Sequence, residues 1–191
     1  MRSRFLLLFL LLPLGGCATA IVPPPPPVEP RNVFLLDHGR HSSLVIEAVD
    51  GVLWRYSYGD WAYYAERQTS VGDGLVALLQ RSPATLGRRE LGSPATVQQV
   101  YRRVPVAITE LLQIEVEAVA ADELRGELEQ LFQRGAAERL HYNADFDLEF
   151  VPHPIPYHLG HNSNQVVAGW LQRLGCEVER RPVLSGWRLV R

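Results

Sequence analysis

Two short stretches of this 191-residue chain carry side chains that could do chemistry. The first, His38–Ile46, contains two histidines, and the second, His161–Gln165, places Ser163 at the expected start of a helix. A helix N-terminus carries about half a positive charge and free backbone N–H groups, which stabilise an oxyanion. A hydroxyl there can attack a carbonyl carbon when an imidazole removes its proton. Ser163 is therefore the candidate nucleophile, and His41 is the candidate general base.

A hairpin expected just after His41 offers a third residue. Asp50-Gly51 lies between two expected strands, Ser42–Val49 and Val52–Gly59, and this dipeptide favours a two-residue turn. Counting back from such a turn places His41 directly opposite Asp60, with the two side chains on one face. A carboxylate at that place would orient the imidazole and stabilise its cation. A purely structural hydrogen bond between the two residues is the alternative.

Three segments together resemble an uncharacterised bacterial domain family of the circularly permuted papain-like, NlpC-type hydrolases and acyltransferases. They are Asp37–Ile46, Tyr58–Tyr64 and His158–Trp170, in that order along the chain. The resemblance implies an α+β fold with an antiparallel sheet and packed helices. It also implies an early catalytic His and a late nucleophile that follows Asn at the start of a helix. Carried onto this sequence, the catalytic residues are His41, Asp60 and Ser163, and the candidate binding residues are Asn162, Tyr58 and Tyr64.

At the nucleophile position this chain has Ser163 where the family pattern has Cys. A helix end is worth less than about 1 kcal/mol, which helps a thiol of pKa about 8.5 to ionise but is nearly irrelevant for an alcohol. Ser163 would therefore need His41 to take its proton during the reaction. The alternatives are that Ser163 or Asn162 only caps the helix, and that the domain binds a ligand without chemistry. Cys176, beyond the far end of the helix, is expected to be a buried apolar residue.

A third hypothesis is a His-rich metal site. His38 and His41 form one pair with two residues between them, and His158 and His161 form another. Four imidazoles suit zinc, but residues three apart on a strand point to opposite faces. His38 and His41 could therefore share an ion only from a loop. The preferred hypothesis, acyl transfer, requires no cofactor and no metal.

The N-terminus has the features of an export signal. Arg2 and Arg4 precede the apolar run Phe5–Leu14, which at about ten residues is half the length that a bilayer-spanning helix needs. The sequence from Leu14 to Cys17 resembles a bacterial lipobox, which implies cleavage before Cys17 and its modification with diacylglycerol and an acyl chain such as palmitate. Alanine after the Cys resembles outer-membrane sorting, with the domain facing the periplasm.

We therefore divide the chain into a signal peptide (1–16), a lipidated Cys with a Pro-rich tether (17–31) and one folded domain (32–191). The five prolines Pro23–Pro27 favour an extended polyproline II spacer that would hold the domain away from the membrane. The expected substrates are amides, thioesters or esters in cell-wall peptide or lipid. Nucleic acid is not an expected partner, because the net charge is −2 and no basic block is present.

Outside the hairpin, hydrophobic periodicity and turn signals predict the remaining elements. Strands are expected at Val33–Leu36, Thr96–Arg102, Leu112–Ala118 and within Arg181–Val190; helices at Trp61–Arg67, Gly74–Gln80, Asp122–Arg134 and from Ser163 to a stop at Gly175; and irregular chain over His141–Gly160.

Overall fold

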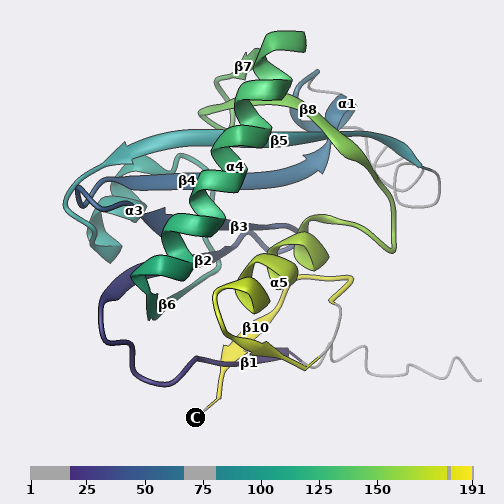
Figure 1. Ribbon diagram of the computed structural model, residues 1–191. Coiled ribbons are helices and arrows are strands. Elements are labelled where there is room, and N and C mark those ends of the chain that lie inside the picture. The colour runs from purple at the N-terminus through teal and green to yellow at the C-terminus, as the bar shows by residue number, and fades with distance from the viewer. Residues whose placement is uncertain (1–17, 67–80, 180–181, 191) are drawn as a thin grey trace, which may run out of the picture.

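The computed structural model describes residues 18–66, 81–179 and 182–190, which form an α+β fold (Figure 1). A seven-stranded antiparallel sheet has the order β6-β2-β3-β4-β5-β8-β7, and a three-stranded sheet has the order β10-β1-β9. The strands are β1 (Thr19–Val22), β2 (Pro30–Asp37), β3 (Ser42–Glu47), β4 (Leu53–Asp60), β5 (Ser82–Gly92), β6 (Glu110–Glu117), β7 (His141–Asn143), β8 (Leu148–Tyr157), β9 (Glu177–Val178) and β10 (Trp187–Leu189). The helices in these ranges are α1 (Trp61–Tyr64), α3 (Val97–Arg103), α4 (Ala118–Glu138) and α5 (Ser163–Arg173).

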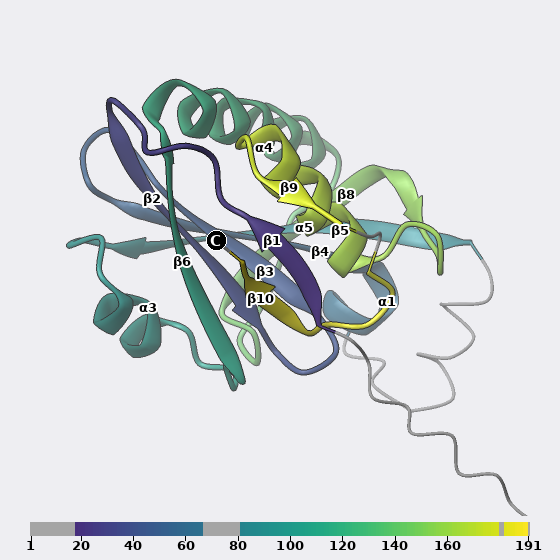
Figure 2. The same cartoon turned by 90° about the horizontal axis from the view of Figure 1, so that it is seen from below.

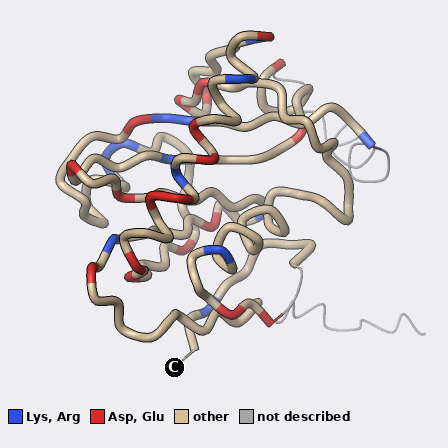
Figure 3. The backbone as a smooth tube through the Cα atoms, in the orientation of Figure 1, with Lys and Arg blue, Asp and Glu red and all other residues tan. Residues whose placement is uncertain are grey.

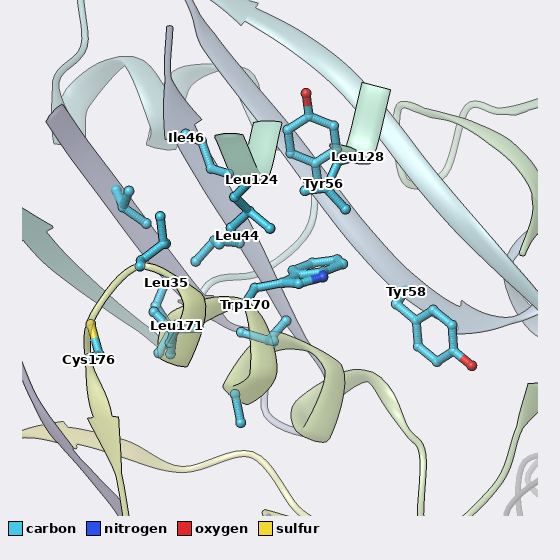
Figure 4. Packing of buried hydrophobic residues seen from close by; sticks show 14 of the residues in the cluster. Leu35, Leu44, Ile46, Tyr56, Tyr58, Leu124, Leu128, Trp170, Leu171 and Cys176 are labelled. Carbon is cyan, nitrogen blue, oxygen red and sulfur yellow. The ribbon is translucent and has the colours of Figure 1, made fainter. Parts of the chain in front are cut away.

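Helices cover both faces of the large sheet (Figure 2). Along β2 four consecutive apolar residues are buried, and they alternate between the two faces. Leu35 packs in the cluster that α4 and α5 cover, with Leu124 and Trp170 (Figure 4). Phe34 faces the other way, toward Val100 of α3. The expected α+β architecture with an antiparallel sheet is confirmed.

The turn between β3 and β4 differs from the expected one. The ladder pairs Val45 with Arg55, one residue away from the predicted register. The loop holds three residues and ends at Gly51, whose φ of +76° lies in the left-handed region. A three-residue loop that ends in this conformation adds a bulge, which shifts the pairing by one residue. The predicted direct opposition of His41 and Asp60 is therefore wrong.

The Pro-rich segment is not a free tether, so this part of the predicted division is also wrong. Ala20 and Ile21 of β1 are fully buried, and β1 pairs with β9 and β10. Four of the five prolines, Pro23, Pro24, Pro26 and Pro27, line a pocket of about 450 Å³ against edge strand β6, and Pro24 lies beside Gly175. The segment docks because Ala20 and Ile21, just before the prolines, are buried by the domain. Proline, which lacks an N–H group, then flanks a strand edge without extending it.

Two further predictions were wrong for local reasons. Residues 97–103 form a helix rather than a strand, because Thr96 caps it by accepting the N–H of Gln99 at 3.2 Å. Residues 148–157 form β8 although three prolines interrupt them. These prolines lie beyond residue 150, where the pairing with β7 ends, and proline is tolerated on a strand edge of this kind. Strand β5, which joins β4 to β8, was not expected from the sequence.

The other predicted elements are present. The strands at β2 and β6 and the helices at α1, α4 and α5 are confirmed with shifted ends, and Gly175, with φ +87°, follows α5. The predicted signal peptide, Cys17 and the predicted helix Gly74–Gln80 lie outside the described residues. Within the ranges that the structure describes, none of the helices has the length and apolarity needed to cross a bilayer.

The docking of the Pro-rich segment can be tested with two apolar residues that flank its prolines. Ile21 is fully buried, whereas Val28 is 89% exposed. We expect Ile21→Ala to lower the free energy of unfolding by about 2–5 kcal/mol because it leaves a cavity. Val28→Ala should change it by less than about 0.5 kcal/mol. Urea unfolding measures both; equally small effects would show that the segment is a loose tether after all.

Candidate functional site

A buried polar network joins the two stretches singled out in the sequence. The Ser42 hydroxyl, at the start of β3, donates to Oδ1 of Asn164 in α5 at 2.9 Å and accepts from Nε1 of Trp187 in β10 at 2.8 Å. The Asn164 amide group donates to the carbonyl oxygens of Arg40 (3.1 Å) and Val183 (3.2 Å). Three segments that are far apart in the sequence therefore meet at one end of the sheet.

Asn162 caps helix α5. Its Oδ1 accepts the backbone N–H groups of Asn164 at 3.0 Å and Gln165 at 3.1 Å, and its side chain is 1% exposed. The cap satisfies two of the N–H groups that every helix start leaves unpaired. The Ser163 hydroxyl is therefore not the cap. Of the two helix-capping alternatives, the structure supports the one for Asn162.

His41 and Ser163 lie in contact. Nδ1 of His41 is 3.4 Å from Oγ of Ser163, which is the first residue of α5. This is a long hydrogen bond, as catalytic pairs often have without substrate. Ser163 is buried and His41 is half-buried. The ring of His41 also packs against the rings of Tyr63 and Tyr64, with centroids 5.6 and 5.4 Å away.

Burial sets the protonation state of His41. Loss of solvent, followed by the positive charge of Arg40, lowers the pKa of the imidazole from 6.5 to about 4. At neutral pH the ring is therefore uncharged, and one nitrogen has a lone pair that can accept a proton. A neutral ring is the form that a general base needs.

Asp60 has a different position from the one predicted. One carboxylate oxygen accepts the backbone N–H of Tyr63 at 2.8 Å and so caps α1, and the other accepts the hydroxyl of Ser82. Asp60 thus holds the start of the helix that carries Tyr63 and Tyr64, the two rings packed on His41. It positions the surroundings of the imidazole rather than the imidazole itself.

The two tyrosines predicted to bind a ligand are both buried and have different roles. Tyr64 packs edge-on against His41, and its ring also occupies the space above Gly59. A Cβ at Gly59 would lie 2.2 Å from that ring, so only glycine fits there. Tyr58 donates its hydroxyl to the carbonyl of Ile155 at 2.9 Å, and its ring packs against His161. Burial raises the pKa of both phenols, which stay protonated.

The four histidines proposed for a metal site do not gather. In His38, Nδ1 lies 2.8 Å from the carbonyl oxygen of Ala107, and Nε2 lies 2.9 Å from Oγ of Ser43. Both ring nitrogens are therefore engaged within the protein. In the described part of the chain, no three His, Cys, Asp or Glu side chains are placed to hold one ion.

Sequence reasoning missed the residues that hold the site together. Ser42, Asn164 and Trp187 are as buried as the apolar core, yet each is an ordinary polar or aromatic residue in the sequence. The available signal was the density of small polar residues around His41 and Ser163. Cys176 is buried as predicted, and desolvation raises its pKa to about 11, which keeps the thiol protonated.

The capping assignment can be tested by two single substitutions in adjacent residues. Asn162→Ala removes the acceptor of two helix N–H groups, and we expect it to lower the free energy of unfolding by about 1–2 kcal/mol. Ser163→Ala removes one long hydrogen bond and should cost less than about 1 kcal/mol. Chemical denaturation compares the two. A loss for Ser163→Ala as large as that for Asn162→Ala would mean that the Ser163 hydroxyl has a structural role.

The low pKa of His41 has a measurable consequence for stability. Because the folded state favours the neutral ring, the unfolded chain binds more protons between pH 6.5 and 4, and the melting temperature should fall as the pH drops through this window. The His41 imidazole signals in NMR should titrate near pH 4, and Arg40→Gln should move the midpoint upward. His41→Gln identifies the signals. A midpoint at or above 6.5 would contradict the burial of this ring.

Comparison with known proteins identifies no family. The sequence matches no protein-family model, and neither a curated protein nor a solved structure matches the chain. The fold and the contact between His41 and Ser163 therefore rest on the structure described above, and the likeness to permuted papain-like domains rests on the motifs alone.

Proposed function

We propose that this chain is an acyl hydrolase or acyltransferase of the permuted papain-like type, with Ser163 as its nucleophile and His41 as its general base. The observation that carries the proposal is the 3.4 Å contact between Nδ1 of His41 and Oγ of Ser163 at the start of a helix. The capping role of Asn162 supports it, because the Ser163 hydroxyl is then left for the imidazole.

The chemistry follows from these groups. Oγ of Ser163 bonds to the carbonyl carbon of an amide, thioester or ester while its proton passes to Nδ1 of His41. The charge that develops on the carbonyl oxygen lies at the positive end of α5. Oδ1 of Asn162 accepts the backbone N–H groups of Asn164 and Gln165. In the described part of the chain, no acceptor bonds the backbone N–H of Ser163. That N–H is the candidate oxyanion donor.

The reaction is completed by the same two residues. The bond from the carbonyl carbon to the leaving group breaks, and the proton on His41 passes to the leaving atom. Water, or an acceptor alcohol or amine, then gives a proton to His41 and attacks the acyl-serine. The bond from the carbonyl carbon to Oγ breaks, and His41 returns the proton to Oγ, which restores the Ser163 hydroxyl. Water gives hydrolysis, and another acceptor gives acyl transfer. Asp60 acts through Tyr63 and Tyr64 as a positioning residue.

We also propose that the chain is a lipoprotein anchored to the outer membrane through Cys17, with this domain in the periplasm. The lipobox-like residues before Cys17 and the short apolar run Phe5–Leu14 support this proposal. Amides of cell-wall peptides and esters of membrane lipids would both be within reach of such a domain.

A fluorophosphonate probe tests the nucleophile. We expect the wild-type chain to be labelled at Ser163, as mapped by peptide mass spectrometry, and Ser163→Ala and His41→Gln to lower the labelling rate by about 1,000-fold or more. Asp60→Asn, which changes a carboxylate that does not touch the imidazole, should stay within about 10-fold. The hydrolysis of a p-nitrophenyl ester should follow the same order.

Two outcomes would overturn this assignment. Labelling that survives in Ser163→Ala would exclude Ser163 as the nucleophile. If labelling by a thiol-reactive acyl probe occurred only in Ser163→Cys, the site would keep its geometry but lack serine chemistry. A binding domain would then be the better description.

A further inference from the structure

The chain enters the domain beside the candidate site. The backbone N–H of Thr19, the first residue of β1, donates to the carbonyl of Gly186 at 2.7 Å, and Thr19 pairs with Trp187. The indole N–H of Trp187 in turn donates to the hydroxyl of Ser42, and that hydroxyl donates to Oδ1 of Asn164. Figures 1 and 2 show the start of β1, the start of α5 and the connection from β8 to α5 at the same end of the sheet.

What precedes Thr19 in the sequence is apolar or proposed to be lipidated. Cys17 lies two residues before Thr19, and the apolar run Phe5–Leu14 lies just before Cys17. Two extended residues span about 7 Å. Since the Pro-rich segment is folded onto the domain, it does not act as a spacer. Lipid attached to Cys17, as proposed above, would therefore hold the membrane against this end of the sheet.

The surface at this end carries an apolar patch, beside the exposed, positively charged Arg40. Leu159, Val183 and Leu184 are 44%, 44% and 69% exposed, and the carbonyls of the first two accept from the amide of Asn162. We call these three side chains the apolar rim. The sequence has no Asp, Glu, Lys or Arg between Glu149 and Arg173, so the connection from β8 to α5 is tan throughout in Figure 3. Exposed leucine and valine beside a membrane anchor fit a lipid interface.

We propose that this end of the domain lies on the membrane surface, that the apolar rim enters the lipid interface, and that the site takes its acyl group from an ester-linked membrane lipid. The substrate class rests on the proposed serine mechanism, and the orientation rests on the proposed lipid anchor at Cys17. In the reaction Oγ of Ser163 bonds to the lipid carbonyl carbon and the ester C–O bond breaks. The glycerol oxygen leaves with the proton from His41, and water then releases the fatty acid and restores the proton to Ser163.

The orientation can be measured with two exposed apolar residues, one in the apolar rim and one in the turn of the β3–β4 hairpin. Leu184 is 69% exposed in the rim, and Val49 is 73% exposed in the turn at the far end of β3. Each is changed to Cys in the full chain, labelled with an environment-sensitive fluorophore, and reconstituted into phosphatidylcholine–phosphatidylglycerol vesicles that contain brominated lipid. We expect at least about twofold quenching for Leu184→Cys and almost none for Val49→Cys. Equal quenching, or stronger quenching at position 49, would overturn the orientation.

The substrate class is tested by placing a glutamate at each of the same two positions in turn. Leu184→Glu should lower fatty-acid release from vesicle phospholipid by about 10-fold or more, while hydrolysis of water-soluble p-nitrophenyl acetate stays within about twofold. Val49→Glu should leave both rates unchanged. An unchanged rate of hydrolysis of the soluble ester also shows that each variant is folded.

The results separate the two proposals. A wild-type chain that cleaves the soluble ester but releases no fatty acid from vesicles would contradict a lipid substrate and leave the serine mechanism intact. A Ser163→Ala chain that is as active as wild type would contradict the serine mechanism, and the quenching result would still decide the orientation.

Discussion

One hydroxyl group, that of Ser42, joins by hydrogen bonds three parts of the fold that also share one hydrophobic core. It donates to Asn164 at the start of α5 and accepts from Trp187 in β10, and all three residues are buried. In a low-dielectric interior such bonds are strong, and an unsatisfied partner costs about 1–3 kcal/mol. The contact between His41 and Ser163 depends on this network, because His41 precedes Ser42 and Ser163 precedes Asn164 in the chain. The bonds that seat the helix against the strand therefore also bring the two reactive groups together.

The same network explains why the start of β1 and the site lie at one end of the sheet. Trp187 pairs with Thr19, so the first residue of β1 is fixed to the strand whose indole holds Ser42. The Pro-rich segment then runs away from the site along β6 rather than into solvent. The segment that was expected to hold the domain away from the membrane is instead folded onto the domain.

Features set by local chemistry could be predicted from the sequence. Helix α5 could be predicted, because Asn162 supplies its cap and Gly175 follows its end. Its buried side is an apolar stripe of Val167, Trp170 and Leu171. The meeting of His41 with Ser163 was also expected, although only from a resemblance. What failed depends on tertiary context. The register of β3 and β4 followed from one left-handed glycine, Gly51, which no pattern of apolar residues reveals. The route of the Pro-rich segment depended on burial of Ala20 and Ile21 by strands at the far end of the chain.

Ser42 and Asn164 form one buried interaction, and we infer that it places Ser163 against His41. A double-mutant cycle measures it directly, with the free energies of unfolding of Ser42→Ala, Asn164→Ala and the double variant compared with wild type. We expect a coupling energy of about 1 kcal/mol or more between the two positions. A coupling within about 0.3 kcal/mol of zero would mean that the two residues act independently, and the proposed basis for the site would be wrong.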